Sequence, residues 1–138
     1  MAEGPTGELG ELLMRVARSQ RHRWRESLAP WDLSPHQARA LRVVCERDGV
    51  RLSDLAGSLR IAPRSATEVA DGLQARGLVE RTPDPRDRRA VVLRPTAEGR
   101  RVRAEVGRAR AAVDEALLAR LSDDDRATLT RLLSALLD

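Results

Sequence analysis

The sequence predicts a mainly α-helical fold with one small β-hairpin wing, and three patterns carry this prediction. Within residues 52–73, apolar side chains recur at helical spacing on both sides of a break at residues 60–62, which is typical of a helix-turn-helix. Apolar runs at residues 78–81 and 90–93 then flank a loop at residues 82–89 that is rich in proline, aspartate and arginine, as in a β-hairpin. Helical spacing returns near both ends of the chain. We therefore expect a winged helix-turn-helix with additional N- and C-terminal helices.

The helix that precedes the helix-turn-helix has a clear start signal. Ser34 occupies an N-cap position, Pro35 the first helical position and Gln37 the third, which together predict a capping box. We expect this helix to run from about residue 35 to residue 48 and to bury Cys45 on its apolar side. Buried cysteine usually behaves as a small hydrophobe, so a structural role for Cys45 is favoured over redox sensing.

Within the helix-turn-helix, Ser53 is predicted to cap the first helix, and residues 50–52 to form a short strand that pairs with the hairpin. Arg60 stands where a helix C-cap favours glycine, so the turn is either slightly strained or built differently. The second helix is expected to begin at Pro63, whose missing N–H is harmless in a first turn. Its predicted inward-facing residues are Val69, Ala70 and Leu73.

The terminal helices carry long apolar faces. Thr96 is predicted to cap a long helix and Ser122 to cap the last one. The apolar face of the N-terminal helix consists of Leu9, Leu12, Leu13, Val16 and Ala17, and that of the last helix of Leu129, Leu132, Leu133, Leu136 and Leu137. Faces of this size need a partner surface, which a second copy of the chain supplies. The alternative is packing within one chain alone.

Positive charge is concentrated in the middle of the chain. All 25 basic residues are arginine, against 21 acidic residues. Residues 51–103 carry 12 arginines and 7 acids, whereas residues 1–50 carry 8 and 7, and residues 104–138 carry 5 and 7. A surplus of arginine on the predicted winged helix is what a phosphate-facing surface requires. The sequence therefore predicts that the winged helix binds double-stranded DNA.

The N-terminal part of the second helix of a helix-turn-helix enters the major groove. This rule makes Arg64, Ser65, Thr67 and Glu68 the candidate DNA-reading residues. An arginine fork fits guanine or holds a phosphate, hydroxyls bind phosphate, and a threonine methyl can contact thymine. Glu68 either accepts a hydrogen bond from cytosine or pairs with Arg64 one turn earlier, and we favour the pairing.

Two stretches of the sequence resemble a known family. GLVER at residues 77–81 and DPRDRRAVVLRPTAEG at residues 84–99 are similar to the signature of the MarR family of dimeric winged-helix transcriptional regulators. The resemblance covers roughly residues 8–137, although Glu68 departs from the basic or polar residue often found there. It implies one MarR-like domain over residues 1–138, in which about 34–95 form the DNA-binding winged helix and about 8–30 and 96–138 form dimerisation helices.

The resemblance also implies roles for individual residues. Arg89 would insert into the minor groove and Asp87 would orient it, with Arg86 and Arg88 beside them on the wing. The expected assembly is a homodimer on a palindromic operator, more often a repressor than an activator. A small aromatic or anionic effector is expected to release the operator. The candidate effector-binding residues are Arg15, Trp24, Trp31 and His36, of which the two tryptophans fit core packing equally well.

Other classes of function have little support in the sequence. Two histidines and one cysteine are too few and too scattered for a zinc site, and neither nucleotide-binding glycine motif is present, so we expect no metal, no cofactor and no enzyme activity. The chain lacks a long apolar run and a secretory signal pattern, which predicts a cytoplasmic protein without membrane spans. The competing hypothesis is a winged-helix protein-interaction module without sequence-specific DNA binding. The arginines on both the predicted DNA-reading helix and the wing favour DNA binding over the protein-interaction hypothesis.

Overall fold

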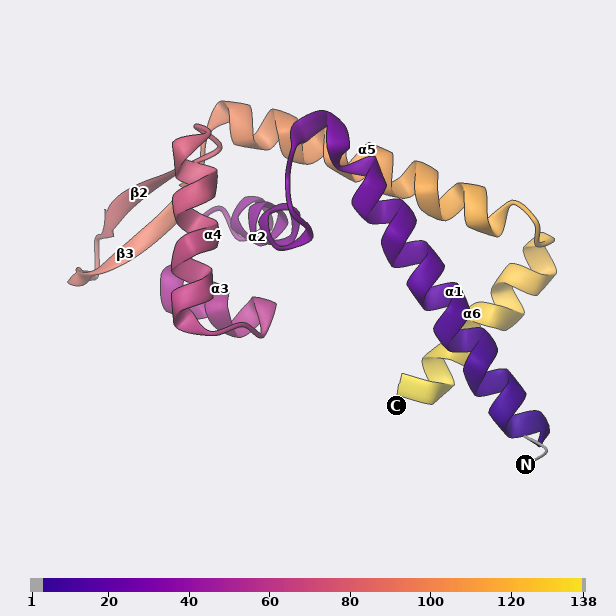
Figure 1. Cartoon of the computed structure of the whole chain (residues 1–138). Helices are drawn as coiled ribbons and strands as arrows, with labels where there is room; N and C mark the ends of the chain where they lie inside the picture. Colours follow the sequence, from indigo (N-terminus) through magenta and orange to yellow (C-terminus); the bar gives the residue numbers. More distant parts are fainter. Residues whose placement is uncertain (1–3, 138) are drawn as a thin grey trace. The chain divides into compact units, whose positions relative to one another are not determined.

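The structure, a computed structural model, describes residues 4–137 and confirms the predicted fold class (Figure 1). It contains long helices and a three-stranded antiparallel sheet. In chain order, the elements are α1 (Pro5–Ser27), a 3₁₀ turn (Ala29–Trp31), α2 (Pro35–Glu46), β1 (Val50–Arg51), α3 (Leu52–Leu59), α4 (Pro63–Ala75), β2 (Val79–Asp84), β3 (Asp87–Pro95), α5 (Ala97–Leu118) and α6 (Asp123–Leu137).

The contacts divide the chain into two compact units. Residues 28–108 form the core unit, and the described parts of residues 1–27 and 109–138 form the terminal unit, so α5 contributes to both. Among residues 4–137, no helix combines the length and the apolar character that crossing a membrane requires.

The core unit is built around α2, α3 and α4, which contact one another, and around a sheet that contacts α2, α3 and α4 (Figure 1). Leucines from each layer meet in its centre, where Leu41, Leu55, Leu73 and Leu93 are fully buried. Burial of one leucine contributes roughly 1.5–3 kcal/mol, so these side chains hold the helices on the sheet.

The predicted capping box of α2 is present. The Ser34 hydroxyl accepts the Gln37 N–H at 3.1 Å, and the Gln37 side chain accepts the Ser34 N–H at 2.9 Å. The helix ends at Glu46, two residues before the predicted end, because Asp48 and Gly49 take positive φ angles of 50° and 121°. A left-handed residue cannot continue a right-handed helix.

Two predictions about the helix-turn-helix were wrong in detail. Ser53 does not cap α3, because that helix begins at Leu52 and its N-cap is Arg51, the last residue of β1. Val69 is only half-buried, whereas Ala66 is fully buried on the inner face of α4. On α2, Cys45 is half-buried, whereas the sequence predicted that it is buried.

The hairpin is longer than predicted. Its strands continue to Asp84 and restart at Asp87, so the turn consists of Pro85 and Arg86 rather than of residues 82–89. The prediction failed because it treated Pro83 as a loop residue, yet β2 is an edge strand in the order β1-β3-β2. An edge strand tolerates proline, which has no N–H to donate. The predicted pairing of the short strand with the hairpin is confirmed, with Val50 opposite Leu93.

A charged link attaches the wing to the helices. Asp84 lies at a β-bulge and is only 7% exposed. Its Oδ2 accepts hydrogen bonds from Arg51 Nε at 2.7 Å and Nη2 at 2.5 Å, and its Oδ1 accepts the Arg86 backbone N–H at 2.9 Å. The backbone hydrogen bond and the guanidinium lower the pKa of Asp84, so the carboxyl is held in its charged form.

The start of α5 packs unusually closely on the strand region. Thr96 caps the helix as predicted, since its hydroxyl accepts the Gly99 N–H at 2.9 Å while it donates to the Gly77 carbonyl at 2.6 Å. Gly99 is buried, and a Cβ on it would lie 1.9 Å from the Leu78 carbonyl oxygen. Only glycine therefore fits at this position.

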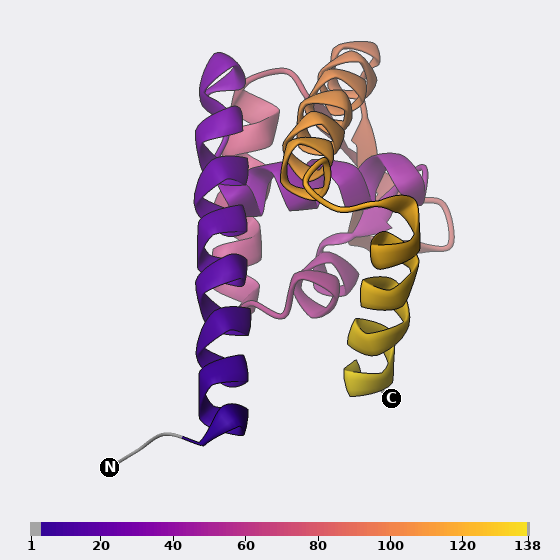
Figure 2. The same ribbon diagram turned by 90° about the vertical axis from the view of Figure 1, so that its right-hand side faces the viewer.

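The terminal unit has little core of its own. Ser122 caps α6 as predicted, through the Asp125 N–H at 3.1 Å, yet no residue between Pro5 and Ser27 of α1 or between Asp123 and Leu137 of α6 is buried. The two helices cross in the view of Figure 1 and lie apart in Figure 2. Exposed large apolar side chains of this unit are Leu9, Leu12, Leu13, Met14, Val16, Leu132, Leu133, Leu136 and Leu137.

We predict that Gly99→Ala lowers the free energy of unfolding by at least about 1–3 kcal/mol, because the added methyl group would collide with the buried Leu78 carbonyl. Urea denaturation followed by circular dichroism measures this loss. Gly57→Ala is the matched control, since Gly57 is exposed on α3 and a methyl group added there would meet no neighbouring atom within 4 Å. Its substitution should leave stability unchanged or raise it by up to about 1 kcal/mol. Equal stability of Gly99→Ala and the unmodified protein would contradict the close packing.

The Asp84 link predicts an acid-sensitive wing. Because the folded state lowers the pKa of Asp84, its contribution is complete above the unfolded pKa, about 3.9, and is lost as the pH falls through the folded value. Asp84→Asn should therefore destabilise the protein at pH 7, and the difference should shrink below about pH 4. Urea unfolding across this range measures it. Asp87→Asn, an equal charge change at an exposed wing position, should cost less at pH 7. A difference for Asp84→Asn that is independent of pH would contradict the link.

Candidate nucleic-acid interface

The turn of the helix-turn-helix is closed by a non-glycine residue. Arg60 takes the left-handed conformation, with φ 56° and ψ 46°, and its N–H points to the carbonyls of Ala56 and Gly57. The next N–H, that of Ile61, donates to the Ala56 carbonyl at 3.1 Å. Left-handed backbone costs a non-glycine residue about 1–2 kcal/mol, so the strained alternative for this turn is correct.

The first turns of α4 divide cleanly into an inner and an outer face. Ala66, Ala70 and Leu73 are fully buried against the core unit. The predicted reading residues Arg64, Ser65 and Glu68 are exposed on the other side, and Thr67 is half-buried between the two faces. The Thr67 hydroxyl donates its hydrogen to the Pro63 carbonyl at 3.1 Å, so that its methyl group and the acceptor side of its oxygen remain available to a ligand.

Arg64 and Glu68 form the i,i+4 pair that we favoured from the sequence, but only loosely. The Arg64 Nε and Glu68 Oε1 atoms are 4.0 Å apart, and the side chains are 93% and 71% exposed. Exposed pairs of this kind contribute at most about 1 kcal/mol. Both side chains are therefore free to exchange this contact for one with DNA.

The wing tip presents four charged side chains to solvent. Arg86, Asp87, Arg88 and Arg89 are all exposed at or beside the two-residue turn. The Asp87 carboxylate accepts the backbone N–H of Arg89 at 3.0 Å. Asp87 thus fixes the backbone from which the Arg89 side chain projects.

A second charged link, which the sequence analysis did not identify, joins the hairpin to α4. Arg81 on β2 donates to the Asp71 carboxylate on α4 at 2.5 Å and also to the Gln74 side chain. Arg81 belongs to the GLVER motif, but its partners lie on a helix rather than on the paired strand, so strand periodicity gave no sign of the contact. Together with Arg51 and Asp84, it ties the wing to the helix-turn-helix.

The four candidate effector-binding residues lie in different places. Arg15 lines a cavity of about 430 Å³ in the terminal unit, together with Leu12, Leu117 and other residues. Trp24, in the same unit, has its ring 4.4 Å from the guanidinium carbon of Arg110, at cation–π distance.

The other two belong to the core unit. Trp31 donates its indole N–H to the Glu105 carboxylate at 2.9 Å, and His36 is exposed at the start of α2. Burial raises the pKa of the Cys45 thiol, near the end of α2, which favours its uncharged form. Over residues 4–137, no group of three or more histidine, cysteine or acidic side chains is arranged to hold a metal ion.

Comparisons with known proteins agree with this geometry. A family model described as "MarR family" matches residues 33–91. The HTH-type transcriptional regulator YsmB of Bacillus subtilis is 30% identical over 99 residues, which cover 72% of this chain and 68% of the relative. A MarR family protein from Bacillus stearothermophilus is 28% identical and superimposes with a TM-score of 0.85, covering 99% of this chain and 95% of that structure.

One similar structure contains DNA. A mutant of MarR from E. coli, crystallised with operator DNA, is 26% identical and has a TM-score of 0.79 over 95% of this chain and 94% of its own. The family assignment rests on the 30% sequence identity to YsmB, on the match of residues 33–91 to the family model and on the shared fold. The chain therefore belongs to the MarR family of transcriptional regulators.

Proposed function

We propose that the chain is a homodimeric transcriptional repressor that binds a palindromic operator, with one α4 in each major groove and one wing in each flanking minor groove. One observation carries this proposal: the exposed arginines of α4 and of the wing tip belong to one unit in which Arg81 and Arg51 tie the wing to the helices. Such a unit can contact two grooves of one duplex at a fixed spacing.

The first turns of α4 would supply the base readout. Arg64 has a fork that fits the guanine edge, and its loose contact with Glu68 is easily exchanged. Ser65 binds phosphate through its hydroxyl, and the Thr67 methyl group is available to a thymine methyl. Glu68 either keeps its pair with Arg64 or accepts from cytosine.

The wing would supply the minor-groove contact. Arg89 projects from a backbone position held by Asp87, and a narrow A·T-rich groove attracts an inserted arginine. Arg86 and Arg88 on the same tip would neutralise phosphates on either side of the groove.

A homodimer explains the exposed apolar faces of the terminal unit. The helices α1 and α6 have no buried residue over their described lengths and carry nine exposed large apolar side chains. Exposed apolar side chains in this number on two helices are typical of an interface. An isologous pair also matches the two half-sites of a palindrome.

The family resemblance adds a small aromatic or anionic effector that would release the operator. The cavity beside Arg15 supports this part of the proposal, because its apolar wall of Leu12, Val16 and Leu117 is bordered by Arg23 and Arg120 as well. An apolar body with a negative group would match both features.

We predict that Arg64→Ala and Arg89→Ala weaken operator binding in different ways. Loss of Arg64 should cost about 1–3 kcal/mol and relax the preference at one base pair per half-site, if it reads guanine. Loss of Arg89 should weaken operators with A·T-rich flanks more than those with G·C-rich flanks. Fluorescence anisotropy on operators defined by footprinting, varied in flank or centre, measures both effects.

Two controls make this experiment decisive. Arg18→Ala, an equal charge change at an exposed position on α1, should leave binding nearly unchanged. Asp87→Ala should resemble a weaker Arg89→Ala, because it frees the backbone of Arg89 without removing the side chain. Unchanged affinity of Arg89→Ala for every flank would refute the minor-groove role.

We further predict that the double substitution Leu132→Glu and Leu136→Glu converts the dimer to a monomer and abolishes tight operator binding, because it places charge on the apolar face of α6. Sedimentation velocity at micromolar concentration measures the assembly state. Ser134→Glu on the same helix adds charge at an exposed polar position and should leave the dimer intact. An unmodified protein that sediments as a stable monomer would contradict the dimer.

A further inference from the structure

One residue of the helix-turn-helix has a strained backbone that no local effect explains. Among residues 4–137, three non-glycine residues take positive φ angles, namely Asp32 at 50°, Asp48 at 50° and Arg60 at 56°. Aspartate enters the left-handed region more readily than most residues, because its short carboxylate can form hydrogen bonds locally. Arginine has no such advantage. A strained residue of this kind is a candidate for a functional role.

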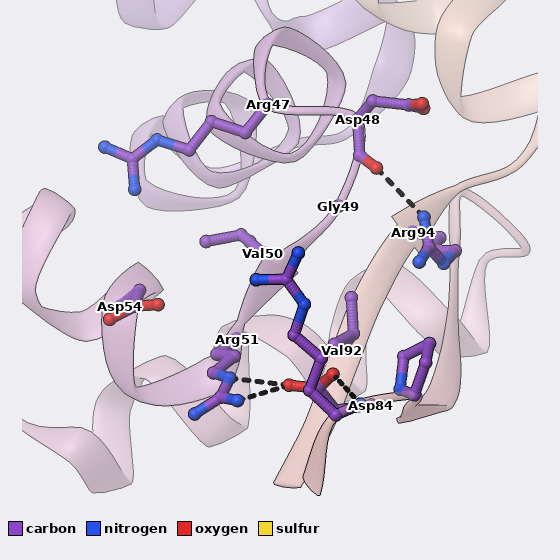
Figure 3. Close-up of a pocket in the computed structure, with 11 residues that line it drawn as sticks. Arg47, Asp48, Gly49, Val50, Arg51, Asp54, Asp84, Val92 and Arg94 are labelled. Carbon is purple, nitrogen blue, oxygen red and sulfur yellow. Dashed lines mark hydrogen bonds and ion pairs between the residues drawn. The ribbon is translucent and has the colours of Figure 1, made fainter.

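The two aspartates are also held in place by contacts within the fold. The Asp48 carbonyl accepts a hydrogen bond from Arg94 at 3.1 Å (Figure 3), and the Asp32 carbonyl accepts one from Arg76 at 2.6 Å. Arg60, in contrast, is exposed, and within the described chain its side chain has neither a hydrogen bond nor an ion pair. The folded chain therefore contains a left-handed arginine whose guanidinium contributes nothing to it.

The position of Arg60 indicates what its guanidinium contacts. In a helix-turn-helix bound to DNA, the first helix crosses the phosphate backbone and the start of the second enters the major groove. Arg60 stands between these two helices, directly after α3. Leu59 is 3% exposed and Ile61 is half-buried, whereas Arg60 is exposed. In the proposed complex, the Arg60 side chain would therefore extend from the turn at the edge of the groove, where the phosphates lie.

The charge around the turn also favours a phosphate. Arg39 on α2 donates to the Leu59 carbonyl at 3.4 Å, and Arg64 in the first turn of α4 is 93% exposed. Within the described chain, Arg39, Arg60 and Arg64 share one ion pair, the loose contact of Arg64 with Glu68. A surplus of exposed guanidinium groups attracts the phosphate backbone of a duplex.

We propose that Arg60 binds a backbone phosphate of the operator and that its strained conformation is retained for this contact. The proposal rests on the proposed function, and it adds a residue of the turn to those of α4 and the wing. A phosphate contact carries no sequence information, so Arg60 strengthens binding to any duplex, unlike a base-reading Arg64. Glycine would relieve the strain but lose the contact, so stability and DNA affinity favour different residues at this position.

The first test measures DNA affinity against salt concentration. Fluorescence anisotropy gives the Kd of Arg60→Gly for the operator and for an unrelated duplex of equal length, over about 50–200 mM salt. We expect about tenfold weaker binding to both duplexes at the lowest salt, because one charged hydrogen bond is lost. The slope of log K against log salt should become shallower by about one unit.

Two variants serve as controls for the affinity test. Arg60→Lys keeps a positive charge at the turn, so it should keep the salt slope and lose less affinity than Arg60→Gly. Arg108→Gln removes the same charge from an exposed position on α5, outside the helix-turn-helix, and should leave both the Kd and the slope nearly unchanged. Equal losses in Arg60→Lys and Arg60→Gly would overturn the electrostatic role of Arg60.

The second test separates the contact from an effect on folding. Urea unfolding followed by circular dichroism should give Arg60→Gly a higher midpoint than the unmodified protein, because glycine takes positive φ without a steric penalty. Arg60→Asn, which also tolerates left-handed backbone, should lose as much DNA affinity as Arg60→Gly without a lower midpoint. Lower midpoints in both variants would overturn the opposition between stability and affinity.

The remaining outcomes distinguish this inference from the proposed function. If the unmodified protein binds the operator but Arg60→Gly binds it equally well with the same salt slope, the phosphate contact is wrong and the proposed function stands. A loss confined to the operator would also overturn the phosphate contact, because it would show that Arg60 reads bases. If the unmodified protein binds no duplex DNA, the proposed function and the Arg60 contact are both refuted.

Discussion

The position of the wing depends on a buried carboxylate. Asp84 is sequestered at the bulge of β2, and a carboxylate in that setting is tolerated only when its oxygens have partners. Arg51 supplies two of them and is also the last residue of β1 and the N-cap residue of α3. One guanidinium therefore joins the wing, the short strand and the helix-turn-helix, while Arg81 joins β2 to α4. These charged links add to the apolar contacts of Leu93 and Val79 in fixing the wing relative to α4.

The composition of the core sets how closely these elements approach. Without phenylalanine or tyrosine, the core unit is filled by leucine, valine and alanine, and Ala40, Ala66 and Ala70 are fully buried between helices. Small side chains allow short distances between elements, and Gly99 against the Leu78 carbonyl is the extreme case. Such contacts provide rigidity through fit rather than through buried area. The charged links can then hold the wing in a fixed position on a rigid core unit.

Local signals in the sequence predicted local features. The capping residues Ser34, Thr96 and Ser122 and the helix start at Pro63 depend on neighbours within one turn, and the structure confirms them. The pairing of the short strand with β3 was predicted across a long sequence distance, but other features that depend on distant partners escaped prediction. The hairpin extends through Pro83 because β3 lies beside it, and Asp84 is buried because Arg51 comes from 33 positions earlier. The residues proposed to read DNA were named from their place in the helix-turn-helix pattern, but neither link that ties the wing to the helices has a local pattern.

The terminal helices present a different physical problem from the core unit. A helix gains little stability in water without burial of an apolar face, and neither α1 nor α6 buries a residue within its described length. Contacts such as Gln20 with Asp114 and Trp24 with Arg110 hold parts of the terminal unit together, but they are polar and partly exposed. Their contribution is small beside that of nine large apolar side chains removed from water. In the proposed dimer, these helices therefore become ordered when the two DNA-binding units pair. A substitution that weakens dimerisation should then weaken operator binding as well.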